Sequence, residues 1–147
     1  MATLFVPPDL SSRPFNVSVA RAMTATPAVL YRAWTEQFDR WFAVPGTVLM
    51  NGQVNSVFFF ETQHEQMRHP HYGRFLRLER DRLVELTWLT SATNGFETVV
   101  TVDLRPDAER GTHLRLNHAG FPGEELRKRH EQAWPIVLEQ LDQRVAH

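Results

Sequence analysis

Three polar side chains fall where the sequence pattern predicts a buried surface. Arg21 interrupts the apolar face of a segment that alternates with period two, and His118 continues the register of Leu114 and Leu116. His130 falls on the apolar face of the last helical segment. A buried arginine or histidine needs a hydrogen-bonding partner. Each of the three could therefore fix a carboxylate or hydroxyl of a bound molecule, with a neighbouring protein group as the alternative partner.

Large aromatic residues form the second group with chemical potential. The 147 residues include 10 Phe, 4 Trp and 2 Tyr, and most of these fall on faces that the pattern turns inward. They can fill an ordinary core, or they can line an apolar pocket in which a few polar groups orient a small molecule. The predicted cavity residues are Arg21, Trp34, Trp41, Phe58, Phe60, Tyr72, Phe75, Trp88, Val100, His118, His130 and Trp134.

A cluster of histidines could be read as a metal site. His69 and His71, two residues apart, would share one face of a strand, with His64 nearby. The stretch 62–70 is polar, however, and we expect it to form a solvated hairpin tip, so no metal is predicted. Serine nucleophile elbows, phosphate-binding glycine loops and HExxH are absent from the sequence. We therefore assign no catalytic residue and no cofactor.

The charge pattern excludes several classes of partner. The formal net charge is −1, and basic and acidic residues are interspersed, so nothing predicts binding to nucleic acid or to an anionic membrane. No apolar run is long enough to span a membrane, and the first residues do not read as a signal peptide. No cysteine is present, which suits a reducing compartment. We expect a soluble, cytoplasmic protein.

The elements that position these residues are mostly strands. Seven are predicted, at 15–23, 47–51, 54–63, 72–80, 83–90, 96–105 and 112–118. Short connections with turn residues such as Asn51-Gly52 and Asn94-Gly95 favour antiparallel pairing of sequence neighbours. The strands from 83 and from 96 alternate apolar and polar residues, so one face of the sheet must be covered.

Three helical segments are predicted, two short ones after the first strand and a long one at the end. Thr26-Pro27 reads as an N-cap followed by proline at the first helical position, and a second short helix or turn passes through Trp41 and ends near Pro45-Gly46. A long amphipathic helix follows Pro122-Gly123 and covers the sheet, with a bend expected at Pro135. Residues 1–14, which are rich in proline, are predicted to form an arm before a single domain at 15–147.

This order of elements, with the residues at its joints, resembles one family. The matching residues are Thr26-Pro27-Ala28, Ala33-Trp34-Thr35, Arg40-Trp41-Phe42, Gly73-Arg74, Leu83 to Trp88, Gly111 to His118, Gly120-Phe121-Pro122, and His130 with Ala133-Trp134, Leu138 and Leu141. The chain resembles the START-like, or SRPBCC, superfamily, and within it the branch named after the activator of the heat-shock protein ATPase. Two departures are Asn55-Ser56, where the family usually has paired glycines, and Ala133, where it usually has glycine.

The resemblance implies an α+β helix-grip fold, also described as Bet v-like, with a cavity between a curved sheet and the last helix. Members of the superfamily include ligand carriers, aromatic cyclases and cochaperone-like domains, so the fold does not name the function. Our leading interpretation is a noncatalytic domain that binds a small hydrophobic, aromatic or lipid-like ligand. The alternatives are a cyclase or lyase that uses a cavity histidine, and a cochaperone-like protein-interaction domain. A chaperone partner is disfavoured, and self-association as a homodimer stays open.

Overall fold

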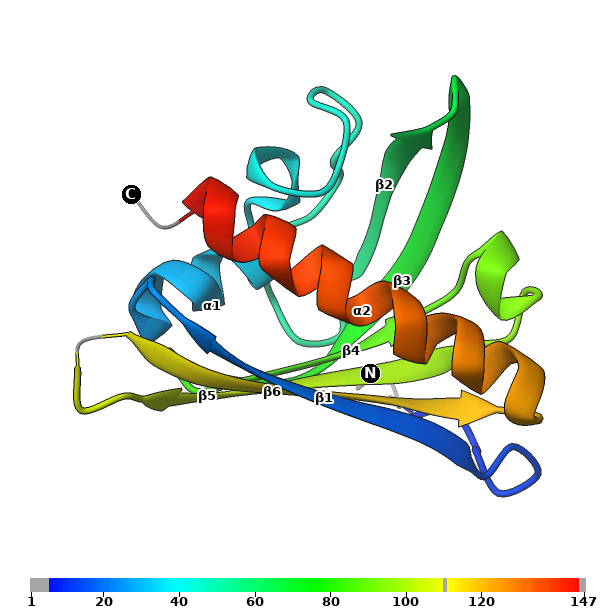
Figure 1. The fold of residues 1–147 in the computed structure, drawn as a ribbon. Coiled ribbons are helices and arrows are strands. Elements are labelled where there is room, and N and C mark those ends of the chain that lie inside the picture. Colours follow the sequence, from blue (N-terminus) through cyan, green and yellow to red (C-terminus); the bar gives the residue numbers. More distant parts are fainter. Residues whose placement is uncertain (1–5, 110, 146–147) are drawn as a thin grey trace, which may run out of the picture.

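Six antiparallel strands form one sheet that carries the long last helix on one face (Figure 1). The computed structural model describes residues 6–109 and 111–145. The elements in chain order are β1 (Phe15–Met23), α1 (Pro27–Thr35), the 3-10 turn η1 (Phe38–Arg40), β2 (Val57–His64), β3 (Met67–Glu79), β4 (Leu83–Trp88), the 3-10 turn η2 (Ser91–Thr93), β5 (Thr98–Pro106), β6 (Thr112–Phe121) and α2 (Glu124–Val145).

The strands pair in the order β1-β6-β5-β4-β3-β2. Strands β2 to β6 are a meander of sequence neighbours, and β1 completes the sheet by pairing with β6. Alternation decides which side chains face inward: Val100, Val102 and Leu104 of β5 are buried, and the residues between them are half-buried on the other face. The predicted α+β fold, with a curved antiparallel sheet and a long C-terminal helix, is confirmed.

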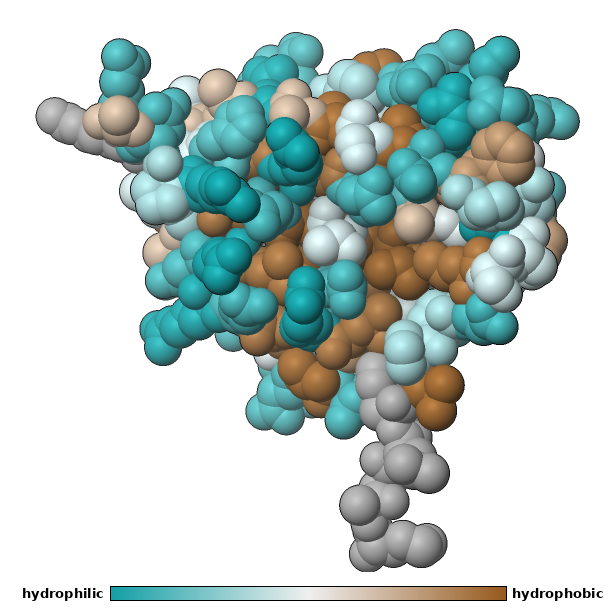
Figure 2. All heavy atoms as spheres, turned by 90° about the horizontal axis from the view of Figure 1, so that it is seen from below, coloured by the Kyte–Doolittle hydropathy of each residue, from teal (hydrophilic) through white to brown (hydrophobic). Residues whose placement is uncertain are grey.

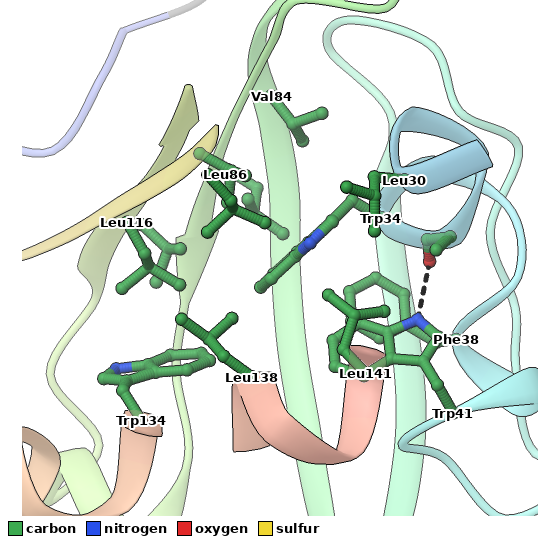
Figure 3. Close-up of a cluster of buried hydrophobic side chains, with 14 of the residues drawn as sticks. Leu30, Trp34, Phe38, Trp41, Val84, Leu86, Leu116, Trp134, Leu138 and Leu141 are labelled. Atoms are coloured by element: carbon green, nitrogen blue, oxygen red, sulfur yellow. Dashed lines mark hydrogen bonds between the residues drawn. The ribbon is translucent and has the colours of Figure 1, made fainter. Parts of the chain in front are cut away.

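Helix α2 lies across the inner face of the sheet, with α1 beside its C-terminal half (Figure 1). Its buried residues recur at intervals of three and four, which gives one apolar stripe: Leu126, His130, Trp134, Leu138, Leu141 and Val145. Leu138 and Leu141 face Trp34 of α1 in the centre of the core (Figure 3). The helix is continuous through Pro135, and the bend expected there stays a prediction.

The start of α1 follows the sequence signal. The Oγ1 of Thr26 accepts a hydrogen bond from the backbone N–H of Val29 at 3.3 Å, and Pro27 occupies the first turn. The chain after α1 is held back onto it, because the indole Nε1 of Trp41 donates to the carbonyl oxygen of Ala33 at 2.9 Å (Figure 3). This bond fixes Trp41 in the core.

The prediction of seven strands is wrong, because 47–51 does not form one. Leu49 exchanges two backbone hydrogen bonds with Phe59, at 2.8 and 3.0 Å, which forms an isolated bridge and not a strand. The Oγ1 of Thr47 also accepts from the backbone N–H of Glu61 in β2 at 3.1 Å. Gly46 and Gly52, which flank the segment, both have a positive φ, so the chain turns before and after the bridge. Similarly, β2 begins only at Val57, because Asn55 has a φ of 69°.

The solvated hairpin tip predicted at 62–70 is present, but β2 and β3 extend further into it than the predicted strands at 54–63 and 72–80. Only Glu65 and Gln66 form the turn, with φ values of 52° and 67°. The polar side chains of this stretch lie on an exposed ribbon, which a polarity argument cannot distinguish from a loop. The extended register matters for the site because it pairs His71 with Phe60 on the inner face.

The end of the N-terminal arm is tied to the sheet. The guanidinium of Arg13 donates to the carbonyl oxygens of Gly120 at 2.7 Å and Glu97 at 3.0 Å, and it lies 5.1 Å from the ring centre of Phe96. Gly120 has a φ of 106°, and a Cβ there would lie 3.0 Å from Leu10, so the arm passes close to the backbone of β6. The division into an arm at 1–14 and one domain stays a prediction.

Candidate functional site

A small pocket lies between the C-terminal end of β4 and the middle of α2. Its volume is about 170 Å³, and it is open to solvent on one side. The lining is largely apolar and comes from five parts of the chain: Phe42, His71, Trp88, Thr90, Ala92, His130, Ala133, Trp134 and Val137. This is the usual character of a small-molecule site, although the volume is below the range for drug-sized ligands.

Local sequence rules place these residues around the pocket. Val84, Leu86 and Trp88 alternate inward along β4, so Trp88 ends the strand with its ring on the inner face. The chain then turns sharply, because Thr90 and Thr93 form a reciprocal capping box around η2. That turn brings Ala92 to the rim. On α2, His130, Ala133, Trp134 and Val137 recur at three and four and so share one side of the helix.

The walls are stacked and tilted aromatic rings. The rings of Trp88 and Trp134 have centres 5.5 Å apart, Phe42 lies 6.1 Å from Trp88, and His71 stands edge-on to Trp88 at 5.2 Å. His71 also stacks on Phe60 at 4.8 Å. Such contacts contribute about 0.5–1.5 kcal/mol each beyond area burial. The pocket therefore has rigid walls with π faces.

His71 supplies one polar edge of the pocket. Its Nδ1 lies 2.9 Å from the carbonyl oxygen of His69, an acceptor only, so Nδ1 carries the proton and donates. Burial of the ring lowers its pKa to about 4. The hydrogen bond to the backbone of His69 opposes this shift, and the electrostatic effect of the His69 ring adds to it. His71 is therefore neutral at pH 7, with the lone pair on Nε2.

His130 supplies a second polar edge from α2. Its Nδ1 lies 2.8 Å from the carbonyl oxygen of Leu126, one turn earlier, so this ring also carries its proton on Nδ1. Burial is the main cause that lowers the pKa of His130, and Arg129 acts in the same direction. The ring stands edge-on to His118 at 4.9 Å between centres.

His118 lies behind the pocket and is sealed into the protein. The indole Nε1 of Trp134 donates to its Nδ1 at 3.0 Å, so its proton must be on Nε2, which lies 2.7 Å from the Oγ1 of Thr98. The hydroxyl of Thr98 in turn donates to the carbonyl oxygen of Trp88 at 2.5 Å. Burial, with His130 nearby, holds the pKa of His118 well below its usual value. Both nitrogens of His118 are therefore used by protein partners.

The predicted cavity residues separate into groups. Trp88, His130 and Trp134 line the pocket. Most of the others pack against one another in the core: Trp34, Trp41, Phe58, Phe60, Phe75 and Val100. Phe38, which stacks on Phe60 at 4.5 Å, fills the space between these rings. The sheet and helix thus enclose mainly side chains, and the small pocket lies at one end of that interface.

Two of the predicted cavity residues lie elsewhere. Tyr72 is 49% exposed, because it alternates with the inward His71 and so points to the outer face of β3. Arg21 does face α2, but its guanidinium lies 3.4 Å from the carboxylate of Asp142 near the end of that helix, away from the pocket. Its partner is therefore the protein group that the sequence analysis kept as the alternative.

Several lining residues were not among those predicted. His71 is the most informative, because His71, Gly73 and Phe75 have the period-two spacing of an inward face. The sequence prediction omits His71 because the predicted strand begins only at Tyr72, after the predicted hairpin tip at 62–70. Gly73 leaves no room for a side chain, since a Cβ there would lie 2.2 Å from the ring of Phe58. Thr90, Ala92 and Val137 carry no local signal for a pocket.

Other surfaces offer weaker sites. The outer face of the sheet shows apolar side chains among polar ones (Figure 2). An open hollow of about 330 Å³ over β2 and β3 is lined by Leu49, Val57, Phe58, Phe59, Tyr72 and Gly73. Among residues 6–109 and 111–145, no three histidine, aspartate or glutamate side chains converge as metal ligands, and the expectation of no metal stays a prediction. No helix in the same ranges is long and apolar enough to cross a membrane.

The fold defines an α+β protein in which a curved antiparallel sheet carries a long C-terminal helix. The family model described as Activator of Hsp90 ATPase homolog 1-like protein matches residues 24–146, and the chain belongs to this family. The resemblance to the START-like superfamily and this branch of it is confirmed.

Solved structures share the fold at low sequence identity. Protein CV1439 from Chromobacterium violaceum is 22% identical, with a TM-score of 0.77 over 91% of this chain and 99% of that one. Protein MLL2253 from Mesorhizobium loti is 24% identical, with a TM-score of 0.68 over 88% of this chain and 95% of that one. CalU16 from Micromonospora echinospora is 20% identical, with a TM-score of 0.67 over 88% and 75%. No curated protein matches the chain.

Proposed function

We propose that this protein is a noncatalytic binding domain that holds a small, largely apolar molecule in the pocket between β4 and α2. The observation that carries the proposal is the aromatic pocket itself. Large side chains pack closely in the centre of the sheet–helix interface, yet Trp88, Trp134 and Phe42 leave about 170 Å³ open between them. Membership in a START-like family supports the same reading, because the superfamily includes ligand carriers.

The chemistry of the lining supports binding over catalysis. None of the nine lining side chains is a carboxylate, a lysine or an arginine, and burial lowers the pKa of both pocket histidines. His118, the first candidate for a proton shuttle, has each nitrogen in a hydrogen bond to the protein. General acid–base catalysis is most efficient when a group has a pKa near the working pH, and burial moves the pKa of both pocket histidines downward from the ordinary value.

The test of this proposal places a large side chain at the rim of the pocket, so that the side chain occupies the space of the ligand. Ala133 and Gln132 are adjacent, exposed positions of α2, but only Ala133 lines the pocket. Ala133→Phe should abolish binding of small aromatic and aliphatic ligands in calorimetric titrations, while Gln132→Phe, the matched control, should bind like the wild type. Absence of saturable binding to the wild type across such a panel, or equal binding by Ala133→Phe, would refute the proposal.

A cochaperone-like role is the second candidate, and the family description is what favours it. Such a role acts through the outer surface, so Ala133→Phe should leave the capture of a chaperone unchanged while it removes ligand binding. The two functions are thereby separated by one variant. A cytoplasmic location and a homodimer stay predictions, and light scattering of the purified protein measures the second.

A further inference from the structure

The two histidines of the pocket expose the same ring atom. Both use Nδ1–H as a donor to a backbone carbonyl, His71 to His69 and His130 to Leu126. In a neutral imidazole the other nitrogen is an acceptor. The pocket therefore contains two Nε2 lone pairs on rings whose proton position is fixed by the backbone.

Neither Nε2 atom has a protein partner among the residues that the structure describes. Within these residues, the polar side-chain atoms that lack both solvent and a partner are the Nε of Arg21 and the Nε1 of Trp34. The Nε2 atoms of His71 and His130 are not in that group, so each reaches open space. Since both rings are nearly buried and line the pocket, the pocket is that space.

Two further polar groups belong to the lining, the hydroxyl of Thr90 and the indole N–H of Trp88. The Oγ1 of Thr90 already accepts from the backbone N–H of Thr93 at 3.2 Å. By the same reasoning the indole Nε1–H of Trp88, which has no protein partner among the described residues and is not fully buried, is a donor at the pocket. A ligand in the pocket thus meets two acceptors, this one indole donor, aromatic faces and no fixed positive charge from the lining residues. An anion would gain no ionic partner here. A neutral hydrogen-bond donor, by contrast, would bond to a histidine Nε2 that otherwise contacts only solvent.

The size of the pocket limits the ligand. A cavity of about 150 Å³ is known to hold one benzene ring, and this pocket has about 170 Å³. Flat walls at Trp88 and Trp134 suit a flat molecule.

We infer that the pocket binds a neutral, single-ring aromatic molecule with a hydroxyl or N–H donor, such as a phenol or an aniline, which donates to the Nε2 of His71 or His130. This inference rests on the proposed function, because it specifies the ligand of the same pocket. A site with preset acceptors discriminates strongly against an isostere that lacks the donor.

The test compares phenol with toluene, which has nearly the same shape and no donor, and with benzoate, which is charged. Calorimetry should show phenol binding between about 2-fold and about 10-fold more tightly than toluene, which is the net effect of one hydrogen bond. Benzoate should bind more weakly than either. One of the two variants His71→Phe and His130→Phe, the one that removes the acceptor of phenol, should abolish the preference for phenol over toluene. Both variants should keep their affinity for toluene.

Two controls keep the result interpretable. His69→Phe changes a neighbour of His71 on the same strand that does not line the pocket, and it should keep the phenol preference. Independently of any variant, the ring ¹⁵N resonance of one Nε2 should shift on addition of phenol and not of toluene. Equal affinity for phenol and toluene, with no Nε2 shift, would overturn the inference while the proposed function stands. Failure of all three ligands to bind would overturn both.

Discussion

The buried histidines make the stability of this protein sensitive to mild acid. In the folded state burial lowers the pKa of His71 to about 4, whereas an exposed histidine of the unfolded chain titrates near 6.5. Above pH 6.5 both states carry a neutral ring, so His71 contributes no pH dependence. Below pH 6.5 only the unfolded chain takes up the proton, and stability falls until the pH reaches the folded pKa.

The expected loss follows from that difference in pKa. Each pKa unit corresponds to about 1.4 kcal/mol, so His71 alone should lower the free energy of unfolding by about 3 kcal/mol between pH 6.5 and pH 4. About 2 kcal/mol of this is already lost at pH 5. Burial also lowers the pKa values of His118 and His130, so these rings add to the loss in the same direction. The total is large against a typical stability of about 5–15 kcal/mol.

Urea unfolding at pH 7.5 and pH 5.0 measures the effect, because few carboxylates titrate in that window. His71→Phe keeps a ring against Phe60 and Trp88 but removes the titrating group, so the acid-induced loss should be about 2 kcal/mol smaller than in the wild type. His113→Gln, at an exposed position of β6, should lose as much stability as the wild type. Equal losses in the wild type and His71→Phe would refute the reasoning.

Three further variants test the packing, each by its free energy of unfolding. Trp41→Phe should be about 1–3 kcal/mol more destabilising than Trp34→Phe, because the Trp41 indole bonds a carbonyl while that of Trp34 has no partner; equal effects would contradict this. Gly73→Ala should cost about 1–3 kcal/mol or more, since its Cβ would lie 2.3 Å from a carbonyl oxygen of β4, and a neutral result would show that β3 can shift. Asp142→Ala should cost about 1–3 kcal/mol, because it removes the hydrogen bonds that the carboxylate accepts from Thr24 and Arg21; an unchanged unfolding midpoint would show that water replaces them.

Local patterns were sufficient for much of the framework. Thr26-Pro27 predicts the start of α1, alternation predicts the inward face of β5, and the three-and-four spacing predicts the buried stripe of α2. These signals depend on neighbours within a few residues. The segment 47–51 shows the limit, because whether it pairs as a strand depends on its contacts with β2, a separate part of the chain.

The dimensions of the site could not be predicted in this way. Whether the aromatic residues enclose a cavity or fill it depends on how Phe38 and Trp41, which follow α1, meet the rings of β2 across the core. Spacing identifies which residues point inward and leaves open how much volume remains between them. His118 illustrates the same point: its inward position was predicted, whereas its partners on α2 and β5 are known only from the fold.

One chain of hydrogen bonds connects the opposite walls of the pocket. It runs from the indole of Trp134 on α2 through His118 on β6 and Thr98 on β5 to the backbone carbonyl of Trp88 on β4. The spacing of the two walls is thus preset by four elements of the fold before any ligand arrives. Binding of the proposed ligand would therefore cost little free energy in reorganisation of the protein. Even a small molecule with few contacts could then bind selectively.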